Sequence, residues 1–384
     1  MTTPLPRNEF AVTQRCIYLN HASAGVLPRM SVEAIDAYVR AHAEGGVLGT
    51  FPYELRLPEY REKIARYIGA RDGEIAIVPN TSLGANTIAL GVDWRQGDEI
   101  LLGDTEFPAN VVPWLALRGR GVAVRMLPAR DERLTPDVLR REISPRTRLI
   151  ALSWVSFGDG YRHDVAGLAA VARENGALLC VDGMQGVGVF PMDVGALGVD
   201  ALYTGATKWM LGLHGAGFLY VRTELLDRLL LATPGWRSQQ DMWDFHNYDQ
   251  PFVQDATRFE GGTVNLPGAL SLACAIDLFQ RSGPAAIAEH VLGLTDRLCE
   301  GLLALGAQVC SARGAGTSSG IVTFRMPGFE SIALGRAWEE HGVMTTYRAN
   351  GIRVSPHGYN EPAEIDEALE TLTRLLRRTQ EVGA

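Results

Sequence analysis

The sequence predicts an α/β fold, with a large domain built on a mostly parallel sheet of seven strands and a smaller α+β domain at the C-terminal end. Short apolar runs alternate with helical patterns through the middle of the chain, and long helices replace this alternation from about Pro267. The chain has 384 residues, of which 46% are hydrophobic and 21% charged. That length suits two domains, and that composition is typical of a globular protein with a sizeable core.

Each predicted strand of the sheet is an apolar run that is short enough to be a buried strand. The seven runs are Glu74–Val78, Glu99–Leu102, Val122–Met126, Arg148–Ser153, Ala177–Val181, Ala201–Tyr203 and Gly217–Val221. Helical segments lie between them, such as Asp164–Asn175, for which Gly176 is a suitable C-cap. Buried strands joined by helical crossovers favour a mostly parallel sheet.

The C-terminal part of the sequence has a different order of elements. Two helices, two strands and a final helix are predicted at Gly268–Arg281, Ala285–Leu305, Gly320–Phe324, Gly351–Ser355 and Pro362–Arg378. We therefore expect a large domain over residues 31–266 and a small domain over residues 267–384. Residues 1–30 are expected to join the small domain as an N-terminal segment.

Composition also excludes several classes of function. The formal net charge is −8 and no Lys/Arg run occurs, which argues against a nucleic-acid partner. The sequence has no uninterrupted apolar run of about 18 residues, so no membrane span is predicted. The eight histidines have no metal-binding spacing, so no metal is expected. The cysteines are odd in number and scattered, which favours a reduced, cytoplasmic environment; they are Cys16, Cys180, Cys274, Cys299 and Cys310.

The chain has only two lysines, and arginine supplies nearly all of its positive charge. Lys63 lies in the charged helical pattern Pro58–Tyr67 and is predicted to be a solvated surface residue. Arginine cannot form a Schiff base at neutral pH, because its guanidinium group stays protonated. A lysine in such a chain is therefore a candidate for a reaction that needs an amine. Lys208, unlike Lys63, does not lie in a charged helical pattern.

Asp182, Gln185 and Lys208 all follow the ends of predicted strands. Ligands of open α/β sheets bind beyond the carboxyl ends of the strands. An aspartate there can pair with a pyridinium nitrogen, and a lysine can hold an aldehyde as an imine, as pyridoxal 5'-phosphate (PLP) requires. Asp182 alone could equally be a helix N-cap. The three residues together predict a PLP site with Lys208 as its reactive amine.

Two further segments suit this cofactor. Pro79–Asn86 follows a strand and opens a helix, so Thr81 and Ser82 could bind a phosphate, although such residues are also ordinary N-caps. Phe107 could stack on the cofactor ring, or could be an ordinary core aromatic residue.

These segments resemble the class V aminotransferase family of fold-type I PLP-dependent enzymes. The similarity begins at Tyr18–Gly25, passes through the Asp182 and Lys208 segments and Arg258–Asn265, and ends at Ile352–Asn360. The pattern is most similar to the isopenicillin-N-epimerase-like branch, beside the cysteine desulfurases. The resemblance implies the fold-type I architecture over most of the chain.

The resemblance also implies roles for individual residues. Lys208 would carry the Schiff base, Asp182 would pair with the pyridine nitrogen, Gln185 with the phenolic oxygen, Thr81 and Ser82 with the phosphate, and Phe107 would cover the ring. Thr263 would reach a phosphate across a dimer interface, which implies a homodimer. Arg353 would bind the substrate carboxylate, where a bidentate guanidinium is well suited. Asn20 and His21 match a segment that lines the substrate entrance.

Two departures from the family pattern bear on the reaction. Thr207 and Gly205 stand where the family often has a histidine and a serine near the phosphate, so Thr207 is the remaining phosphate donor there. Cysteine desulfurases carry a nucleophilic cysteine ahead of the C-terminal arginine, and residues 311–384 contain no cysteine. A persulfide-forming desulfuration is therefore disfavoured, whereas direct C–S β-elimination is not.

The sequence predicts a PLP enzyme that acts on a small amino-acid-like substrate through a Lys208 aldimine and a Cα carbanion. An aminotransferase-type reaction is preferred, with C–S lysis or epimerisation as alternatives. A nucleotide-binding dehydrogenase is a remote alternative, because Gly212–Gly217 precedes a strand instead of following one. A non-catalytic fold relative is also remote. The aromatic segment at residues 235–248 could shape the substrate pocket or form a peripheral loop.

Overall fold

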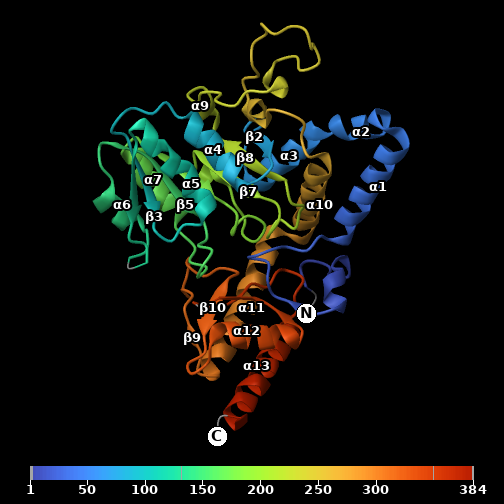
Figure 1. Ribbon diagram of the computed structural model, residues 1–384, viewed down its shortest axis with the longest axis vertical. Helices are drawn as coiled ribbons and strands as arrows, with labels where there is room; N and C mark the ends of the chain where they lie inside the picture. Colours follow the sequence, from blue (N-terminus) through green and yellow to red (C-terminus); the bar gives the residue numbers. More distant parts are fainter. Residues whose placement is uncertain (1–2, 131, 349, 383–384) are drawn as a thin grey trace.

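The computed structural model describes residues 3–130, 132–348 and 350–382, and within them a seven-stranded sheet forms the centre of the large part of the molecule (Figure 1). Its strands are β2 (Ile75–Val78), β3 (Glu99–Gly103), β4 (Ala123–Leu127), β5 (Thr147–Ser153), β6 (Leu178–Asp182), β7 (Ala201–Gly205) and β8 (Gly217–Val221). All seven predicted strands are confirmed, with ends that differ by at most two residues.

The strand order is β2-β8-β7-β6-β5-β3-β4, and β8 runs antiparallel to the other six strands. Both faces of this sheet are covered. Ile100 and Leu102 of β3 pack into one hydrophobic cluster, whereas Leu101 between them packs into another. Because successive side chains point to opposite faces, a sheet covered on both sides requires continuous apolar strands, and these are the runs in the sequence.

Helices and short 3-10 turns surround the sheet. The α-helices before the C-terminal part are α1 (Arg29–Gly45), α2 (Val47–Glu54), α3 (Leu57–Ile68), α4 (Thr81–Gly91), α5 (Val112–Leu115), α6 (Pro136–Glu142), α7 (Val165–Glu174), α8 (Val194–Leu197), α9 (Thr223–Leu226) and α10 (Leu266–Ser282). The 3-10 turns are η1 (Arg7–Glu9), η2 (Ala11–Gln14), η3 (Pro108–Asn110), η4 (Ala116–Arg120), η5 (Trp236–Ser238) and η6 (Ala256–Glu260). The predicted helix after Asp164 is α7, and Asp164 caps it by accepting from Gly167 N at 3.0 Å.

The C-terminal part has its own antiparallel sheet, in the order β12-β13-β10-β9. Its elements are α11 (Pro284–Ala304), β9 (Gln308–Val309), β10 (Val322–Arg325), α12 (Ser331–Glu340), β11 (Val343–Met344), β12 (Thr346–Arg348), β13 (Gly351–Val354) and α13 (Pro362–Val382). They form the lower part of the molecule in Figure 1. The expected small sheet and long helices are present.

The N-terminal segment lies against this C-terminal part. Its strand β1 (Ile17–Tyr18) pairs in parallel with β11, and Leu5 N donates to Gly358 O at 3.1 Å. These contacts attach parts of the N-terminal segment to the C-terminal part of the chain. The domain boundaries, including the grouping of residues 1–30 with the small domain, stay predictions. Over the residues that the structure describes, no helix combines the length and the apolar character needed to cross a membrane.

Candidate active site

A cavity of about 210 Å³ opens at the carboxyl ends of β5, β6 and β7, next to the amino end of α4. Its lining consists of Asn80, Thr81, Ser82, Phe107, Ala109, Ser153, Phe157, Asp182, Met184, Gln185 and Lys208. Six of the eleven sequence-predicted site residues therefore meet in one place, where α/β sheets bind their ligands.

Lys208 lies on a tight turn after β7. Leu211, which closes the turn by donating its N–H to Lys208 O at 3.1 Å, has a φ of 51°, a value that non-glycine residues rarely adopt. The N-terminal segment packs directly on this turn, since Gly25 N donates to Thr207 O at 2.7 Å. A Cβ atom at Gly25 would lie 2.0 Å from Lys208 O, so this approach requires glycine. The turn is therefore held from both sides.

Burial lowers the pKa of Lys208 to about 8, although the nearby charge of Asp182 acts in the opposite direction. Arg353 and Arg348 lower the pKa further, because they place positive charge nearby. A larger fraction of the amine is neutral at neutral pH than in an exposed lysine, and the neutral amine is the nucleophile.

Asp182 is the last residue of β6 and is 4% exposed. Its Oδ1 accepts from Met184 N at 2.8 Å. Burial raises the pKa of Asp182 to about 7; Glu106 raises it further, while the Met184 N–H and Lys208 oppose the rise. A cationic partner in the cavity would stabilise the ionised form of this buried carboxylate.

The amino end of α4 forms one wall of the cavity. The Asn80 side chain caps the helix by accepting from Leu83 N at 2.9 Å, so Thr81 and Ser82 are the first two helical residues and are not the cap. Free N–H groups and the helix dipole make such an end favourable for an anion.

Two phenylalanines stand at the mouth of the cavity. The ring centres of Phe107 and Phe157 lie 5.2 Å apart at an interplanar angle of 78°. Lys208 Nζ lies 5.3 Å from the centre of the Phe107 ring. Phe107 is 42% exposed, so it is not an ordinary core aromatic residue.

Arg353 projects from β13 and is held by two protein oxygens. Its Nη1 donates to Phe157 O and its Nη2 to Ser23 Oγ, each at 2.7 Å. Its Nε is buried and has no partner among the described residues. Burial lowers the pKa of Arg353 to about 10, and Arg348 adds to this. A partly buried cation whose Nε–H is unused favours an anionic ligand, although Arg353 is not itself among the residues that line the cavity.

Neither Asn20 nor His21 is among the residues that line the cavity, and their expected role at the substrate entrance stays a prediction. Asn20 Oδ1 accepts from Thr346 Oγ1 at 2.6 Å, and Thr346 Oγ1 lies 2.5 Å from the Ser23 Oγ that holds Arg353. Asn20 therefore contacts Arg353 only through other side chains, and it does not line the cavity.

His21 is fully buried. Its Nδ1 lies 3.0 Å from Ser355 O and its Nε2 lies 2.9 Å from Tyr359 OH. Burial holds the pKa of His21 well below its usual value. This placement does not favour the predicted direct contact of His21 with substrate.

The remaining predicted residues are placed as follows. Gln185 lines the cavity, with Oε1 accepting from Trp209 Nε1 at 2.7 Å and one Nε2 hydrogen donated to Ala22 O at 3.0 Å, which leaves the other available. Thr207 is half-buried and Thr263 is exposed, and neither lines the cavity. Their predicted contacts with a phosphate stay predictions.

The sequence analysis did not identify Ser153, Phe157, Glu106 or Ser23, all of which shape this site. Ser153 ends a predicted strand at the ligand-binding edge, as Asp182 does, so its position was a usable signal. Glu106 stood next to Phe107 in the same segment. No local sequence pattern identifies Ser23, because its partner Arg353 lies 330 positions away in the sequence.

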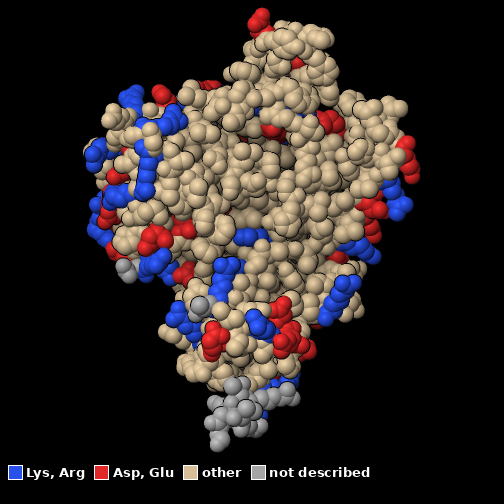
Figure 2. All heavy atoms as spheres, in the orientation of Figure 1, with Lys and Arg blue, Asp and Glu red and all other residues tan. Residues whose placement is uncertain are grey.

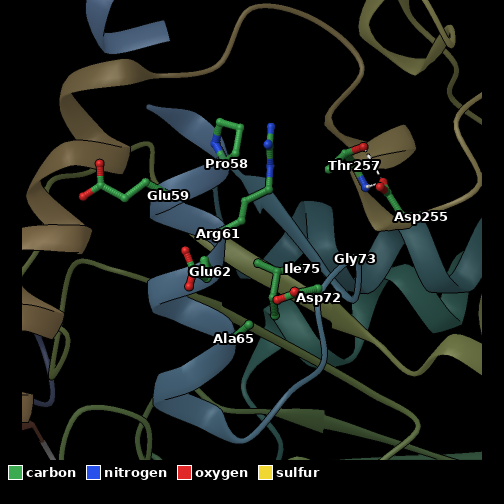
Figure 3. Close-up of a pocket in the computed structure, with 10 residues that line it drawn as sticks. All are labelled: Pro58, Glu59, Arg61, Glu62, Ala65, Asp72, Gly73, Ile75, Asp255 and Thr257. Carbon is green, nitrogen blue, oxygen red and sulfur yellow. Dashed lines mark hydrogen bonds between the residues drawn. The ribbon is translucent and has the colours of Figure 1, made fainter. Parts of the chain in front are cut away.

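Two other features lie outside this cavity. A second cavity of about 410 Å³ lies beside α3 and η6 (Figure 3); none of its lining residues is a lysine, and Asp255 accepts from Thr257 within it. The segment at residues 235–248 contributes nothing to the lining of the Lys208 cavity. It belongs to the loop that projects at the top of Figure 1, so it is peripheral in this chain.

The fold, with a partly buried lysine and a buried aspartate in one cavity, defines an α/β enzyme built around one covalent cofactor site. The Aminotransferase class-V family model matches residues 17–369, so the chain belongs to that family. A probable cysteine desulfurase of Methanothermobacter thermautotrophicus is 32% identical over 304 residues, which cover 78% of this chain and 75% of that protein.

Two solved structures have closely similar folds. A C-DES variant with glycine covalently linked to its PLP cofactor gives a TM-score of 0.89 at 26% identity, covering 95% of this chain and 98% of the other. The cystine C–S lyase C-DES in complex with its product cysteine persulfide gives a TM-score of 0.86 at 27% identity, with 92% and 96% covered. The chain is thus a PLP-dependent class V enzyme with the fold-type I architecture, and the resemblance to the class V family is confirmed. These relatives are a cysteine desulfurase and a C–S lyase, so they support the cysteine-desulfurase-like side of the expected branch and not the epimerase-like side.

Proposed function

We propose that this protein is a PLP-dependent lyase that cleaves the bond between the β-carbon and sulfur of a cysteine-type amino acid. With L-cystine, loss of the Cα proton and of the C–S bond gives cysteine persulfide and 2-aminoacrylate. Water then converts 2-aminoacrylate to pyruvate and ammonium. This reaction needs no external oxidant or reductant, since the bond electrons leave with the sulfur.

The lining of the cavity has the groups that PLP requires. Lys208 would hold the aldehyde carbon, Asp182 the ring nitrogen, and Thr81 and Ser82 with the amino end of α4 the phosphate. The unused hydrogen of Gln185 Nε2 could reach the phenolic oxygen. When bound, PLP takes up the electrons that remain on the substrate Cα after its proton leaves.

The chain's own groups would then direct the reaction. Arg353 has an unused, buried N–H that suits the substrate carboxylate, and the carboxylate would supply the anion that this cation lacks. The Lys208 amine, with its lowered pKa, would accept the proton from Cα. Phe107 and Phe157 would exclude water from the cavity mouth.

The lack of a thiol in the cavity favours direct elimination. None of the residues that line the cavity is a cysteine, and residues 311–384, which include the Arg353 strand, contain none. A desulfurase reaction that passes sulfur to a protein cysteine has no acceptor here, whereas elimination needs none. The similarity to a cystine C–S lyase supports the same choice. The aminotransferase-type reaction preferred from the sequence is less well supported than this alternative.

Product analysis tests the proposal. The purified protein with added PLP is incubated with L-cystine, with L-cysteine, and with L-cysteine plus a 2-oxo acid, beside a Lys208→Ala control. We expect pyruvate and a persulfide from L-cystine, and neither product from the control. Alanine with enzyme-bound sulfur would instead establish a desulfurase, and a new amino acid formed from the 2-oxo acid would establish an aminotransferase; either result would overturn the lyase proposal.

A homodimer is also proposed, with Thr263 contributed across the interface. Large apolar side chains are exposed along the projecting loop and on α2, including Leu48 (82%), Tyr248 (79%) and Phe245 (61%). Figure 2 shows few charged side chains over the top of the molecule, where this loop projects. Exposed apolar patches of this kind mark protein interaction surfaces. The cytoplasmic location stays a prediction.

A further inference from the structure

We propose that Glu106 is a positioning residue of the Lys208 cavity, which anchors the Phe107 loop and adds a second negative charge beside Asp182. This inference rests on the proposed function, in which Asp182 faces the ring nitrogen of PLP. Glu106 follows β3 and does not itself line the cavity. Its effect on the cofactor would therefore pass through its neighbours.

The Glu106 carboxylate joins the strand on one side of Asp182. Its Oε1 accepts from Ser153 N at 2.8 Å, and its Oε2 accepts from Ser153 Oγ at 2.5 Å. Ser153 is the last residue of β5 and the register partner of Asp182 on β6. Glu106 is thus fixed beside the strand end that carries Asp182.

A second chain of hydrogen bonds reaches the strand on the other side. Glu106 Oε2 also accepts from Asn110 Nδ2 at 2.9 Å, and Asn110 Oδ1 accepts from Tyr203 OH at 2.5 Å. Tyr203 on β7 is the other register partner of Asp182. The network therefore spans β5, β6 and β7 at the ends where the cavity lies.

The same network fixes Phe107. Asn110 N donates to Phe107 O at 2.8 Å, so both the residue before Phe107 and the turn after it are tied to the sheet. Phe107 can then stay near Lys208 although its ring is exposed at the cavity mouth.

The charge of Glu106 has no cationic partner among its hydrogen bonds, all of which come from neutral donors. The titratable groups that face the two carboxylates are Lys208 and Tyr203. Burial raises the pKa of Glu106, and the Glu106 charge in turn raises the pKa of Asp182. Two carboxylates in this position make the potential more negative, which favours a protonated ring nitrogen.

The test measures that proton directly. Each variant is loaded with PLP labelled with ¹⁵N in the ring, and the ¹⁵N chemical shift is followed against pH. In Glu106→Gln, which keeps the size of the side chain, we expect the ring nitrogen to lose its proton about one pH unit lower than in the parent. We also expect weaker PLP binding in a titration of the apoprotein.

Glu99→Gln is the control, because Glu99 lies at the opposite end of β3 and also accepts from side-chain hydroxyl groups, those of Thr147 and Ser144, in addition to Arg125. It should leave the ¹⁵N profile unchanged. Ser153→Ala removes one donor that stabilises the charged form of Glu106, so less of Glu106 is ionised and the profile should shift in the same direction by less. This variant decides the question if Glu106→Gln does not fold.

Unchanged ¹⁵N profiles in both Glu106→Gln and Ser153→Ala would overturn the inference. A profile that moves equally in Glu99→Gln would also overturn it, because the effect would then be general destabilisation. If the parent itself binds no labelled PLP, the proposed function fails, and that failure is distinguishable from the failure of the Glu106 inference.

Discussion

Lys208, which is partly buried, and Asp182, which is buried, are two ionisable groups whose pKa values are shifted in opposite directions. Burial lowers the pKa of Lys208 to about 8 and raises that of Asp182 to about 7, and each charge partly stabilises the other. Without a cofactor, these groups oppose folding near neutral pH, because burial penalises their charged forms. A cationic ring nitrogen would relieve this penalty for Asp182.

Replacing Asp182 should therefore stabilise the apoprotein. The folded-state pKa of about 7 lies above the ordinary value of 3.8, so the folded chain binds more protons between these two values, and the carboxylate opposes folding as pH rises through that window. The Asp182→Asn apoprotein should exceed the parent in unfolding free energy at pH 8 by up to about 4 kcal/mol, and by almost nothing near pH 4.

Urea unfolding at several pH values measures this difference. Asp193→Asn is a matched control, because Asp193 also accepts a backbone N–H but is exposed. An Asp182→Asn protein that is less stable than the parent at pH 8, or equally shifted at every pH, would contradict the assigned pKa.

Arg353 provides the second prediction at this scale. Arg353→Ala should raise KM for carboxylate substrates by about 10- to 100-fold, since it removes hydrogen bonds to a charged group. Arg325→Ala, on the neighbouring strand and exposed, is the control and should leave KM unchanged. Steady-state kinetics with substrates that carry the carboxylate, and with analogues that lack it, would measure these KM values. Equal KM values for the Arg353→Ala protein and the parent would remove Arg353 from the substrate site.

Some site residues can be predicted from the sequence because they directly follow the strand that positions them. Asp182 and Lys208 each follow an apolar run, so strand ends and sheet topology suffice. His21 and Ser23 lie in one short segment, yet one is buried and the other holds Arg353. That difference depends on pairing with residues more than 300 positions away, which local patterns do not encode.

The helix α4 forms the phosphate wall through its amino end, and its cap is Asn80. Asn80→Ala should lower the unfolding free energy by about 1 kcal/mol, as for other N-cap losses, and should also weaken PLP binding, because Asn80 lines the cavity.

Thr135→Ala is the comparison, since Thr135 caps α6 by accepting from Val138 N and does not line the cavity. It should cause a similar loss of stability without changing PLP affinity. Chemical denaturation and apoprotein titration would separate the two effects, and unchanged PLP affinity in Asn80→Ala would contradict the assigned phosphate wall.

The seven strands of the sheet could be predicted because burial on both faces makes each of them a continuous apolar run. Strands β1, β9, β11 and β12 were not predicted. They have two or three residues each, too few for any periodic pattern, and β1 pairs only with β11.

At the scale of the whole molecule, the projecting loop and α2 carry a group of exposed large apolar side chains, and a second copy is proposed to bind there. The parent protein should sediment at twice the mass of one chain. A Trp243→Ser and Phe245→Ser double variant should sediment as a monomer, because these rings are 46% and 61% exposed and contact each other. Leu303→Ser, exposed to 61% on α11, is the control. A monomeric parent would contradict the proposed homodimer.

The measurement that tests the central claim most directly is the site of PLP attachment. The protein is incubated with PLP, reduced with borohydride so that any lysine–PLP bond becomes permanent, digested and mapped by mass spectrometry. Lys63, the only other lysine, is an internal control, because it is paired with Asp277 at 2.7 Å on α10 and lies outside the cavity. We expect one pyridoxyl group per chain, on Lys208. A chain that carries no pyridoxyl group, or carries it on Lys63, would contradict the account.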